Sequence, residues 1–344
     1  MTRNPARLEA FRFVCFYWLK FANDKIHAFF ARFALDDAPF FRNAAQAPRS
    51  LSRRLSTAQR RSSSILECVS ANLKKHLGTL SKRGPHRVLV GDLSYAGING
   101  KVYTPAEGKG LPAVAFAHDW TKKVKNYHAT LRHLASWGIV VVAPDTETGL
   151  VPNHRNLAAD LESSLQIAAG VKLGTGKIAV SPSKLGVVGH GMGGGVAALT
   201  AVDNPKIRAV AAIYPADTAP SSYAAARSIT APALILGSER EDLFRAGNPA
   251  ELANNWGGKV AYRELAKGTQ AGFTEDRLVK LAIGSGVFQA GATETARALV
   301  TGFLLSTLAG ESKYDDFAEA DATAKGVTSY FGEELAQKAG IHRG

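Results

Sequence analysis

The chain has 344 residues, of which 46% are hydrophobic and 21% charged, a composition that indicates a globular protein with one large core. Its two cysteines, Cys15 and Cys68, exclude a disulfide scaffold and lack the neighbours of a zinc site, and no run reaches the roughly 18 apolar residues that span a bilayer. The formal charge is +13, and the excess lies in residues 1–87, which hold 17 Lys and Arg against 5 acidic residues.

Residues 1–87 predict a basic, aromatic-rich helical extension with a linker. Eleven aromatic side chains fall between residues 11 and 41, where apolar residues recur at helical spacing. A Ser- and Arg-rich linker over 50–64 precedes a second amphipathic helix, which Ser64 and Glu67 begin as a capping box. The aromatic side chains either pack on the main domain or on a second copy, or they accompany the basic residues onto an anionic membrane surface.

Other partners and destinations are less favoured by this segment. Nucleic acid is an unlikely partner, because no helix-turn-helix, zinc finger or RNA-binding signature accompanies the basic residues. Residues 13–19 are the nearest approach to a signal-peptide core, but they run into Lys20 and no small-residue cleavage site follows. We therefore expect a cytoplasmic protein, with the inner membrane surface as a candidate place of peripheral attachment.

After residue 87 the sequence alternates apolar runs with helical patterns. The predicted strands are 88–90, 93–95, 101–103, 113–117, 139–143, 185–189, 207–213, 233–236 and 260–265. The predicted helices are 126–137, 154–169, a helix directly after residue 191, and a closing helix over 294–308. Apolar strands with helical crossovers predict an α/β domain over residues 88–317, with a doubly wound, mostly parallel sheet covered on both faces. Residues 318–344 are expected to form a C-terminal tail.

The most specific motif is the segment Gly189-His190-Gly191-Met192-Gly193. It follows a buried strand and opens an Ala- and Val-rich helix, which is the strand–turn–helix context of a nucleophile elbow. In the usual G-x-S-x-G pattern, the central serine is held on the sharp turn with its hydroxyl exposed. Here the central residue is Gly191, which has no side chain with which to attack a carbonyl group.

This segment resembles the α/β-hydrolase fold, on the branch of the dienelactone hydrolases and the cutinase-like polyester hydrolases. Two further stretches carry the resemblance, 231–237 (APALILG) and 264–270 (ELAKGTQ). The resemblance covers about residues 88–317 and implies the α/β-hydrolase fold there. Residues 1–87 have no counterpart in it.

The resemblance also implies which positions would carry a Ser–His–acid triad. It places the serine at Gly191, the acid at Glu241 or Asp242, and the histidine at Gln270, so that the nucleophile and the base are both replaced. The implied oxyanion donors are the backbone N–H groups of Trp120 and Met192. Asp119, where the family usually has glycine, would put a carboxylate beside developing negative charge, which is unfavourable for catalysis.

Two histidines near the elbow, His118 and His190, could act as a displaced base or as a metal pair. No metal-ligand spacing connects them with neighbouring acidic residues, so we expect no metal and no cofactor. A ligand cleft is expected at the carboxyl ends of the strands. Its expected lining residues are His118, Asp119, Trp120, His190 and Met192.

Two hypotheses for the function remain open. The first is a catalytically silent α/β-hydrolase-fold protein that binds a protein partner or an acyl/lipid-like ligand. The second is an active carboxylic-ester hydrolase, of the dienelactone hydrolase or cutinase-like type, that uses a displaced catalytic group.

Overall fold

The computed structural model describes residues 73–239, 247–275 and 289–340. The division of the chain into two units falls after Ser56, and all described residues belong to the second unit. The first predicted helix, the linker and the start of the second helix therefore lie outside the described residues. Of the second helix, residues 73–80 are described and are helical, with Leu73 and Leu80 fully buried.

The described residues form a nine-stranded sheet in the order β1-β2-β4-β3-β5-β6-β7-β8-β9. The six strands from β3 to β8 are parallel to one another, while β1, β2 and β9 join antiparallel at the two edges. The strands are β1 Val88–Asp92, β2 Gly100–Pro105, β3 Gly108–Ala117, β4 Val140–Pro144, β5 Ile178–His190, β6 Ile207–Ile213, β7 Ala233–Ser238, β8 Val260–Leu265 and β9 Val327–Tyr330. The predicted doubly wound, mostly parallel sheet is confirmed.

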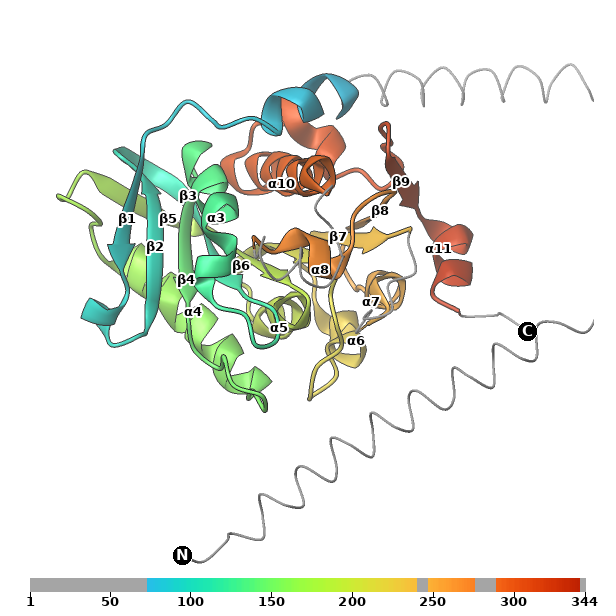
Figure 1. Cartoon of the computed structure of the whole chain (residues 1–344), viewed down its shortest axis with the longest axis horizontal. Coiled ribbons are helices and arrows are strands. Elements are labelled where there is room, and N and C mark those ends of the chain that lie inside the picture. The colour runs from blue at the N-terminus through green and yellow to red at the C-terminus, as the bar shows by residue number, and fades with distance from the viewer. Residues whose placement is uncertain (1–72, 240–246, 276–288, 341–344) are drawn as a thin grey trace, which may run out of the picture. The chain divides into compact units, whose positions relative to one another are not determined.

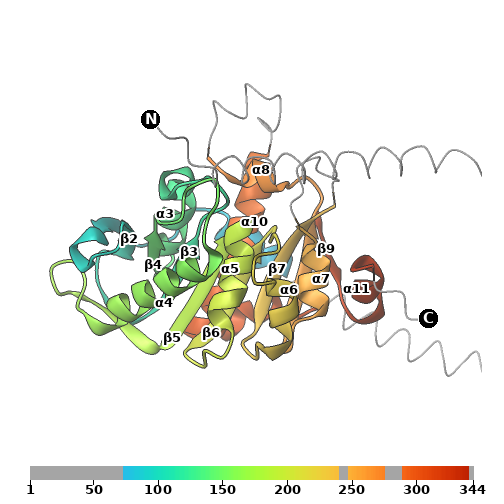
Figure 2. The same ribbon diagram turned by 90° about the horizontal axis from the view of Figure 1, so that it is seen from below.

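Helices cover both faces of this sheet (Figures 1 and 2). One apolar layer is built by α3 (His128–Ser136), α10 (Ala290–Leu304) and residues 73–80. The other is built by α4 (His154–Gly170), α5 (Met192–Ala201) and α7 (Pro249–Asn254). The shorter helices are α6 Ser222–Ala225, α8 Gln270–Phe273 and α11 Gly332–Lys338. The strands are apolar runs because both of their faces are buried.

Two sequence expectations differ from the structure. Residues 93–95, expected to be a strand, lie at a 3-10 turn over Ser94–Ala96, because Asp92 accepts a hydrogen bond from the Ser94 backbone N–H and Gly97 ends the turn at φ 83°. Residues 318–344, expected to be a tail, contain β9 and α11. No helix in the described ranges has both the length and the apolar character needed to cross a membrane.

Candidate functional site

The elbow predicted at residue 191 is present at the junction of β5 and α5. Gly191 has φ 56° and ψ −122°, a conformation that side-chain-bearing residues rarely adopt. Gly189 and Gly193 approach each other so closely that a Cβ atom on Gly189 would collide with the Gly193 carbonyl group. The glycines therefore hold the sharp turn, as the sequence pattern predicts.

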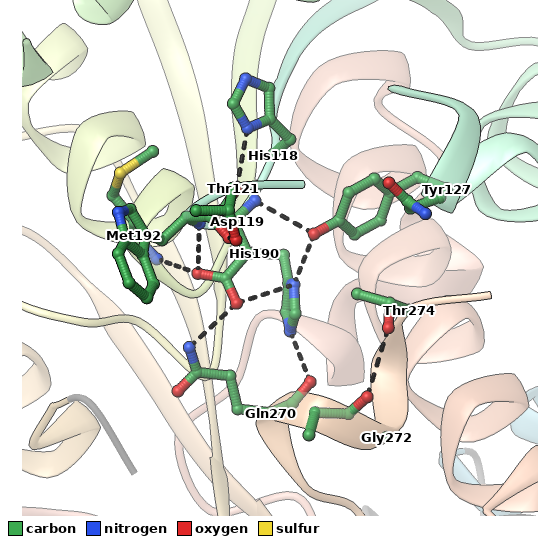
Figure 3. A network of polar contacts seen from close by, with 12 residues as sticks. His118, Asp119, Thr121, Tyr127, His190, Met192, Gln270, Gly272 and Thr274 are labelled. Carbon is green, nitrogen blue, oxygen red and sulfur yellow. Dashed lines mark hydrogen bonds and ion pairs between the residues drawn. The ribbon is translucent and has the colours of Figure 1, made fainter. Parts of the chain in front are cut away.

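The carboxylate of Asp119 lies at the centre of the site (Figure 3). Its Oδ1 accepts hydrogen bonds from two backbone N–H groups, that of Trp120 at 2.8 Å and that of Met192 at 2.9 Å. Its Oδ2 accepts a third hydrogen bond from Gln270 Nε2 at 3.0 Å. The two donors that the resemblance implies for an oxyanion thus both bind Asp119. The sequence predicts a carboxylate beside this position, and the structure places one in it.

Asp119 and Gly191 are sterically matched. A Cβ atom on Gly191 would collide with all three carboxyl atoms of Asp119. The carboxylate consequently fills the space in which a nucleophilic side chain at residue 191 would lie. The Asp119 side chain remains 13% exposed.

A second chain of hydrogen bonds links the Asp119 backbone to the Gln270 backbone beside the carboxylate (Figure 3). The Asp119 backbone N–H donates to the Tyr127 hydroxyl at 3.0 Å, and this hydroxyl contacts His190 Nδ1 at 2.9 Å. His190 Nε2 contacts the Gln270 carbonyl oxygen at 3.0 Å. Because a carbonyl oxygen only accepts, the network assigns the proton of a neutral His190 to Nε2 and makes Nδ1 the acceptor from Tyr127.

Both histidines that the sequence singled out are fully buried. His190 lies against Phe273, with ring centroids 4.9 Å apart, and its Nδ1 is 4.0 Å from Asp119 Oδ2. His118 bridges two backbone carbonyl oxygens, those of Asp119 at 2.9 Å and Thr146 at 2.7 Å. Each ring therefore orients the backbone around the site, and neither presents a nitrogen to an open cleft.

The rim of the site is apolar and exposed. The Trp120 side chain is 50% exposed, and its indole N–H donates to the Leu150 carbonyl oxygen at 3.0 Å. Leu150 and Val151 are 74% and 80% exposed. Glu147 supports this rim loop by accepting a hydrogen bond from the Asn153 backbone N–H. Among the expected lining residues, Trp120 lies at the surface, whereas Met192 is buried.

The acidic position of the predicted triad cannot be placed, since Glu241 and Asp242 lie outside the described residues. Glu239, directly before that gap, is exposed and accepts a hydrogen bond from Thr328 Oγ1 of β9 at 2.6 Å. In the described ranges no three His, Cys, Asp or Glu side chains gather closely enough to hold a metal ion.

Tyr127 is a member of the site that the sequence did not indicate. It lies at the end of a 3-10 turn over Val124–Tyr127, before α3, and is fully buried. Its residue type and spacing are those of an ordinary core aromatic. Only the juxtaposition of this turn with the ends of β3 and β5 gives its hydroxyl two polar partners, the Asp119 backbone and His190.

A family model described as PETase, PET hydrolase-like, matches residues 77–250, just over half of the chain. The chain belongs to this PET hydrolase-like family. This assignment confirms the predicted α/β-hydrolase fold and its cutinase-like branch. The matched range contains the elbow, Asp119 and Tyr127, and it ends before Gln270.

Curated relatives of the chain are cutinases. It is 29% identical to cutinase est1 of Thermobifida alba over 153 residues, which are 44% of this chain and 50% of that protein. It is 26% identical to a cutinase of Thermobifida fusca over 211 residues, or 56% of this chain and 68% of that protein. It is 30% identical to cutinase 1 of Thermobifida cellulosilytica over 156 residues, which are 45% of this chain and 57% of that protein. The chain spans about half the length of the first of these relatives.

Proposed function

We propose that this PET hydrolase-like chain is catalytically silent toward carboxylic esters and that it binds a protein partner or an acyl/lipid-like ligand at the rim of the site. The observation that carries the proposal is the pair of hydrogen bonds from Trp120 N–H and Met192 N–H to Asp119 Oδ1. In a hydrolase that forms a tetrahedral intermediate, preorganised N–H donors must face the substrate oxyanion.

Two physical reasons support the expected lack of ester hydrolysis. A substrate oxyanion would have to displace a carboxylate that carries the same charge and already satisfies both donors. In addition, Gly191 and Gln270 supply neither a nucleophile nor a base that can accept its proton. In a dissected serine protease, the loss of either group lowers kcat by a factor of about 10⁶.

The second candidate function is an active hydrolase that uses a displaced catalytic group. Membership of the PET hydrolase-like family and the similarity to named cutinases favour this candidate. Under it, a side chain other than residue 191 must act on the substrate. The two candidates differ in what purified protein does to an activated ester.

The decisive experiment is the hydrolysis of p-nitrophenyl acetate and p-nitrophenyl butyrate by the full-length chain. The proposal expects no rate above that of buffer with an equal concentration of an inert protein. Treatment with a serine-directed organophosphate serves as the control, since it removes a contaminating serine esterase and cannot react with Gly191. Turnover that survives this treatment and scales with protein concentration would contradict the proposal and support the second candidate.

Cytoplasmic location and attachment to an anionic inner membrane surface through residues 1–87 belong to the same proposal. The 17 basic residues of that segment support it, at about 1 kcal/mol for each one close to an acidic leaflet. Because Leu73 and Leu80 are buried in the domain core, a truncated chain should begin at Thr57, the start of the second unit. The shorter chain lacks 10 of the 17 basic residues and all eleven aromatic side chains of residues 11–41. The proposal therefore expects weaker sedimentation of this shorter chain with phosphatidylglycerol vesicles; equal sedimentation of both chains would contradict a role of residues 1–56 in the attachment and leave, of that segment, only residues 57–87 to carry it.

A further inference from the structure

We propose that the amino-terminal edge of the parallel sheet is a docking surface for an anionic phospholipid bilayer. The segments that lead into or begin β3, β5, β6, β7 and β8 form this surface, named the basic edge. They are residues 105–110, 171–177, 181–184, 202–208, 226–232 and 255–259. The basic edge lies at the opposite end of the strands from the elbow (Figure 2). The inference goes beyond the proposed function, in which residues 1–87 alone carry the attachment.

The basic edge is strongly positive in a domain that is otherwise not. Its segments hold six lysines and two arginines against two acidic residues, Glu107 and Asp203. Residues 88–344 as a whole hold 25 Lys and Arg against 24 acidic residues, so the rest of that range has more acidic than basic residues. The lysines of the edge are Lys109, Lys172, Lys177, Lys184, Lys206 and Lys259. Its arginines are Arg208 and Arg227.

The sheet topology brings these basic residues into one row. The strands β3, β5, β6, β7 and β8 are consecutive in the sheet. Backbone hydrogen bonds join neighbouring segments, from Gly108 N–H to the Lys177 carbonyl oxygen at 3.1 Å and from Ala233 N–H to the Lys259 carbonyl oxygen at 2.8 Å. Since neighbouring strands lie about 4.8 Å apart, the row from β3 to β8 is about 19 Å long.

The cations of this row point to solvent without internal compensation. Seven of the eight side chains are exposed, and Lys184 is half-buried. None of the eight forms an ion pair with another residue in the part of the chain that the structure describes. Their ammonium and guanidinium groups are therefore available to an anionic surface.

The charge preference of helix ends explains only part of this pattern. A helix C-terminus favours a nearby positive charge, which accounts for Lys172, two residues after the end of α4. Lys109, Lys184 and Arg208 instead lie within β3, β5 and β6, and strands have only small net dipoles. The charge of the row is thus left for an external anion to balance.

The side chains of the edge favour a bilayer over a nucleic acid. Sites for single-stranded nucleic acid stack bases on exposed aromatic side chains, whereas the one aromatic side chain in these segments, Trp256, is buried. Duplex readers commonly place a helix in a groove, and these segments are loops, a 3-10 turn and strand starts. Each lysine close to an acidic leaflet strengthens binding by about five-fold. Val171, which is 51% exposed beside Lys172, adds apolar contact at the interface.

Docking at this edge determines where the elbow lies. A parallel strand rises about 3.3 Å per residue, so the seven residues of β6 span about 20 Å. With the basic edge on the bilayer, the elbow at the far end of the sheet lies about 20 Å from the headgroups and faces the aqueous phase. A ligand or partner would then reach the rim from solution and not from within the bilayer.

Lysine footprinting on the full-length natural chain tests the inference. The chain is acetylated with an N-hydroxysuccinimide ester in buffer, with phosphatidylcholine vesicles, and with vesicles of phosphatidylcholine and phosphatidylglycerol in equal parts. Peptide mass spectrometry then measures the rate at each lysine. We expect only the phosphatidylglycerol vesicles to slow acetylation of Lys177, Lys206 and Lys259, by several-fold. Lys125 and Lys267, which are exposed near the carboxyl ends of β3 and β8, are internal controls and should react as in buffer.

Matched variants separate the position of the charge from its amount. The partition coefficient onto phosphatidylglycerol-containing vesicles should fall about 100-fold when three lysines of the edge are neutralised, in the variant Lys177→Gln, Lys206→Gln, Lys259→Gln. The control removes the same formal charge from exposed lysines near the other edge, in the variant Lys125→Gln, Lys267→Gln, Lys325→Gln. It should change the coefficient by less than about five-fold, because exposed charges are screened beyond about 8 Å at physiological ionic strength.

Three results would overturn the inference. The first is equal partitioning of the two triple variants or equal protection of both edges. The second is protection confined to lysines of the N-terminal segment, such as Lys20 and Lys25, which would support attachment through residues 1–87 alone. The third is protection of the basic edge by duplex DNA and not by vesicles, which would assign the edge to nucleic acid. If vesicles protect no lysine at all, the inference and the attachment through residues 1–87 both fail, whereas the p-nitrophenyl ester assay is unaffected.

Discussion

The carboxylate of Asp119 lies over Gly191 in the space that any side chain at residue 191 would need. Glycine at the elbow and an acid at residue 119 are thus one structural feature. Glycine makes room for the carboxylate, and the carboxylate satisfies two backbone N–H groups that an empty elbow would leave without a protein partner. Neither residue can be changed alone without a consequence for the other.

We first predict an energetic coupling between these two residues. Gly191→Ala should lower the free energy of unfolding by about 1–3 kcal/mol or more, because alanine is strained at φ 56° and its Cβ atom collides with Asp119. In an Asp119→Gly background the same change should cost less, with a coupling of about 0.5–3 kcal/mol. Urea unfolding of the wild type, both single variants and the double variant measures this coupling. Strictly additive effects would show that the carboxylate moves away without cost.

The second prediction concerns the introduction of serine chemistry at the elbow. The triple variant Asp119→Gly, Gly191→Ser, Gln270→His should hydrolyse p-nitrophenyl butyrate measurably, since it frees the two N–H donors and supplies a nucleophile and a base. The double variant Gly191→Ser, Gln270→His is the matched control and should remain near background, because its hydroxyl collides with Asp119 and the hole stays filled. Turnover by the double variant equal to that of the triple would mean that Asp119 does not block the site.

The sequence predicted the central strands because a sheet covered on both faces requires continuous apolar runs, such as residues 139–143. It could not predict β9, since Val327–Tyr330 is short and acquires its meaning only by pairing with β8. That pairing joins two segments that lie more than 60 residues apart in the chain, which local sequence patterns do not show. A four-residue run also carries little periodic signal.

In the site, too, the sequence predicted individual residues but not the contacts between them. The sequence identified Asp119, His190 and Gln270 as separate departures or candidates. It could not predict that they bind one another, because they come from the ends of β3 and β5 and from the start of α8, far apart in the chain. A charged residue next to an oxyanion donor looks unfavourable by sequence, whereas the folded chain uses it as the acceptor for both donors.

The third prediction concerns a buried arginine in β8, the strand next to the sheet edge. Arg263 of β8 is fully buried and donates to the backbone carbonyl oxygens of Asp316, Phe317, Glu319 and Ala322. Burial lowers the pKa of its guanidinium group to about 10, which leaves it charged at neutral pH. Arg263→Met should lower the free energy of unfolding by about 3–5 kcal/mol, because the carbonyl oxygens lose their guanidinium donor and, within the described residues, only that of Ala322 keeps a second one, the Ser329 hydroxyl. Arg263→Lys should recover part of the loss; urea unfolding with no loss in Arg263→Met would refute the role.

The fourth prediction concerns the stability of the α3 face against acid. His133 of α3 is 8% exposed, and burial lowers its pKa to about 4, with the nearby positive charge of Arg297 acting in the same direction. In the unfolded chain a histidine has a pKa of about 6.5. Between these values the unfolded chain binds a proton that the folded chain does not. The stability that depends on a neutral His133 is therefore complete above about pH 6.5 and is lost as the pH falls to about 4.

By linkage, protonation of the His133 side chain lowers the free energy of unfolding by about 3 kcal/mol as the pH falls from about 6.5 to about 4. His133→Gln removes the titrating group, so the difference in unfolding free energy between wild type and variant should change by up to this amount between pH 7 and pH 4. The matched control is His86→Gln, whose histidine is exposed, and it should retain the acid sensitivity of the wild type. Urea unfolding at half-unit pH steps measures both differences. A wild-type-minus-His133→Gln difference that stays constant with pH would show that His133 accepts its proton within the folded protein.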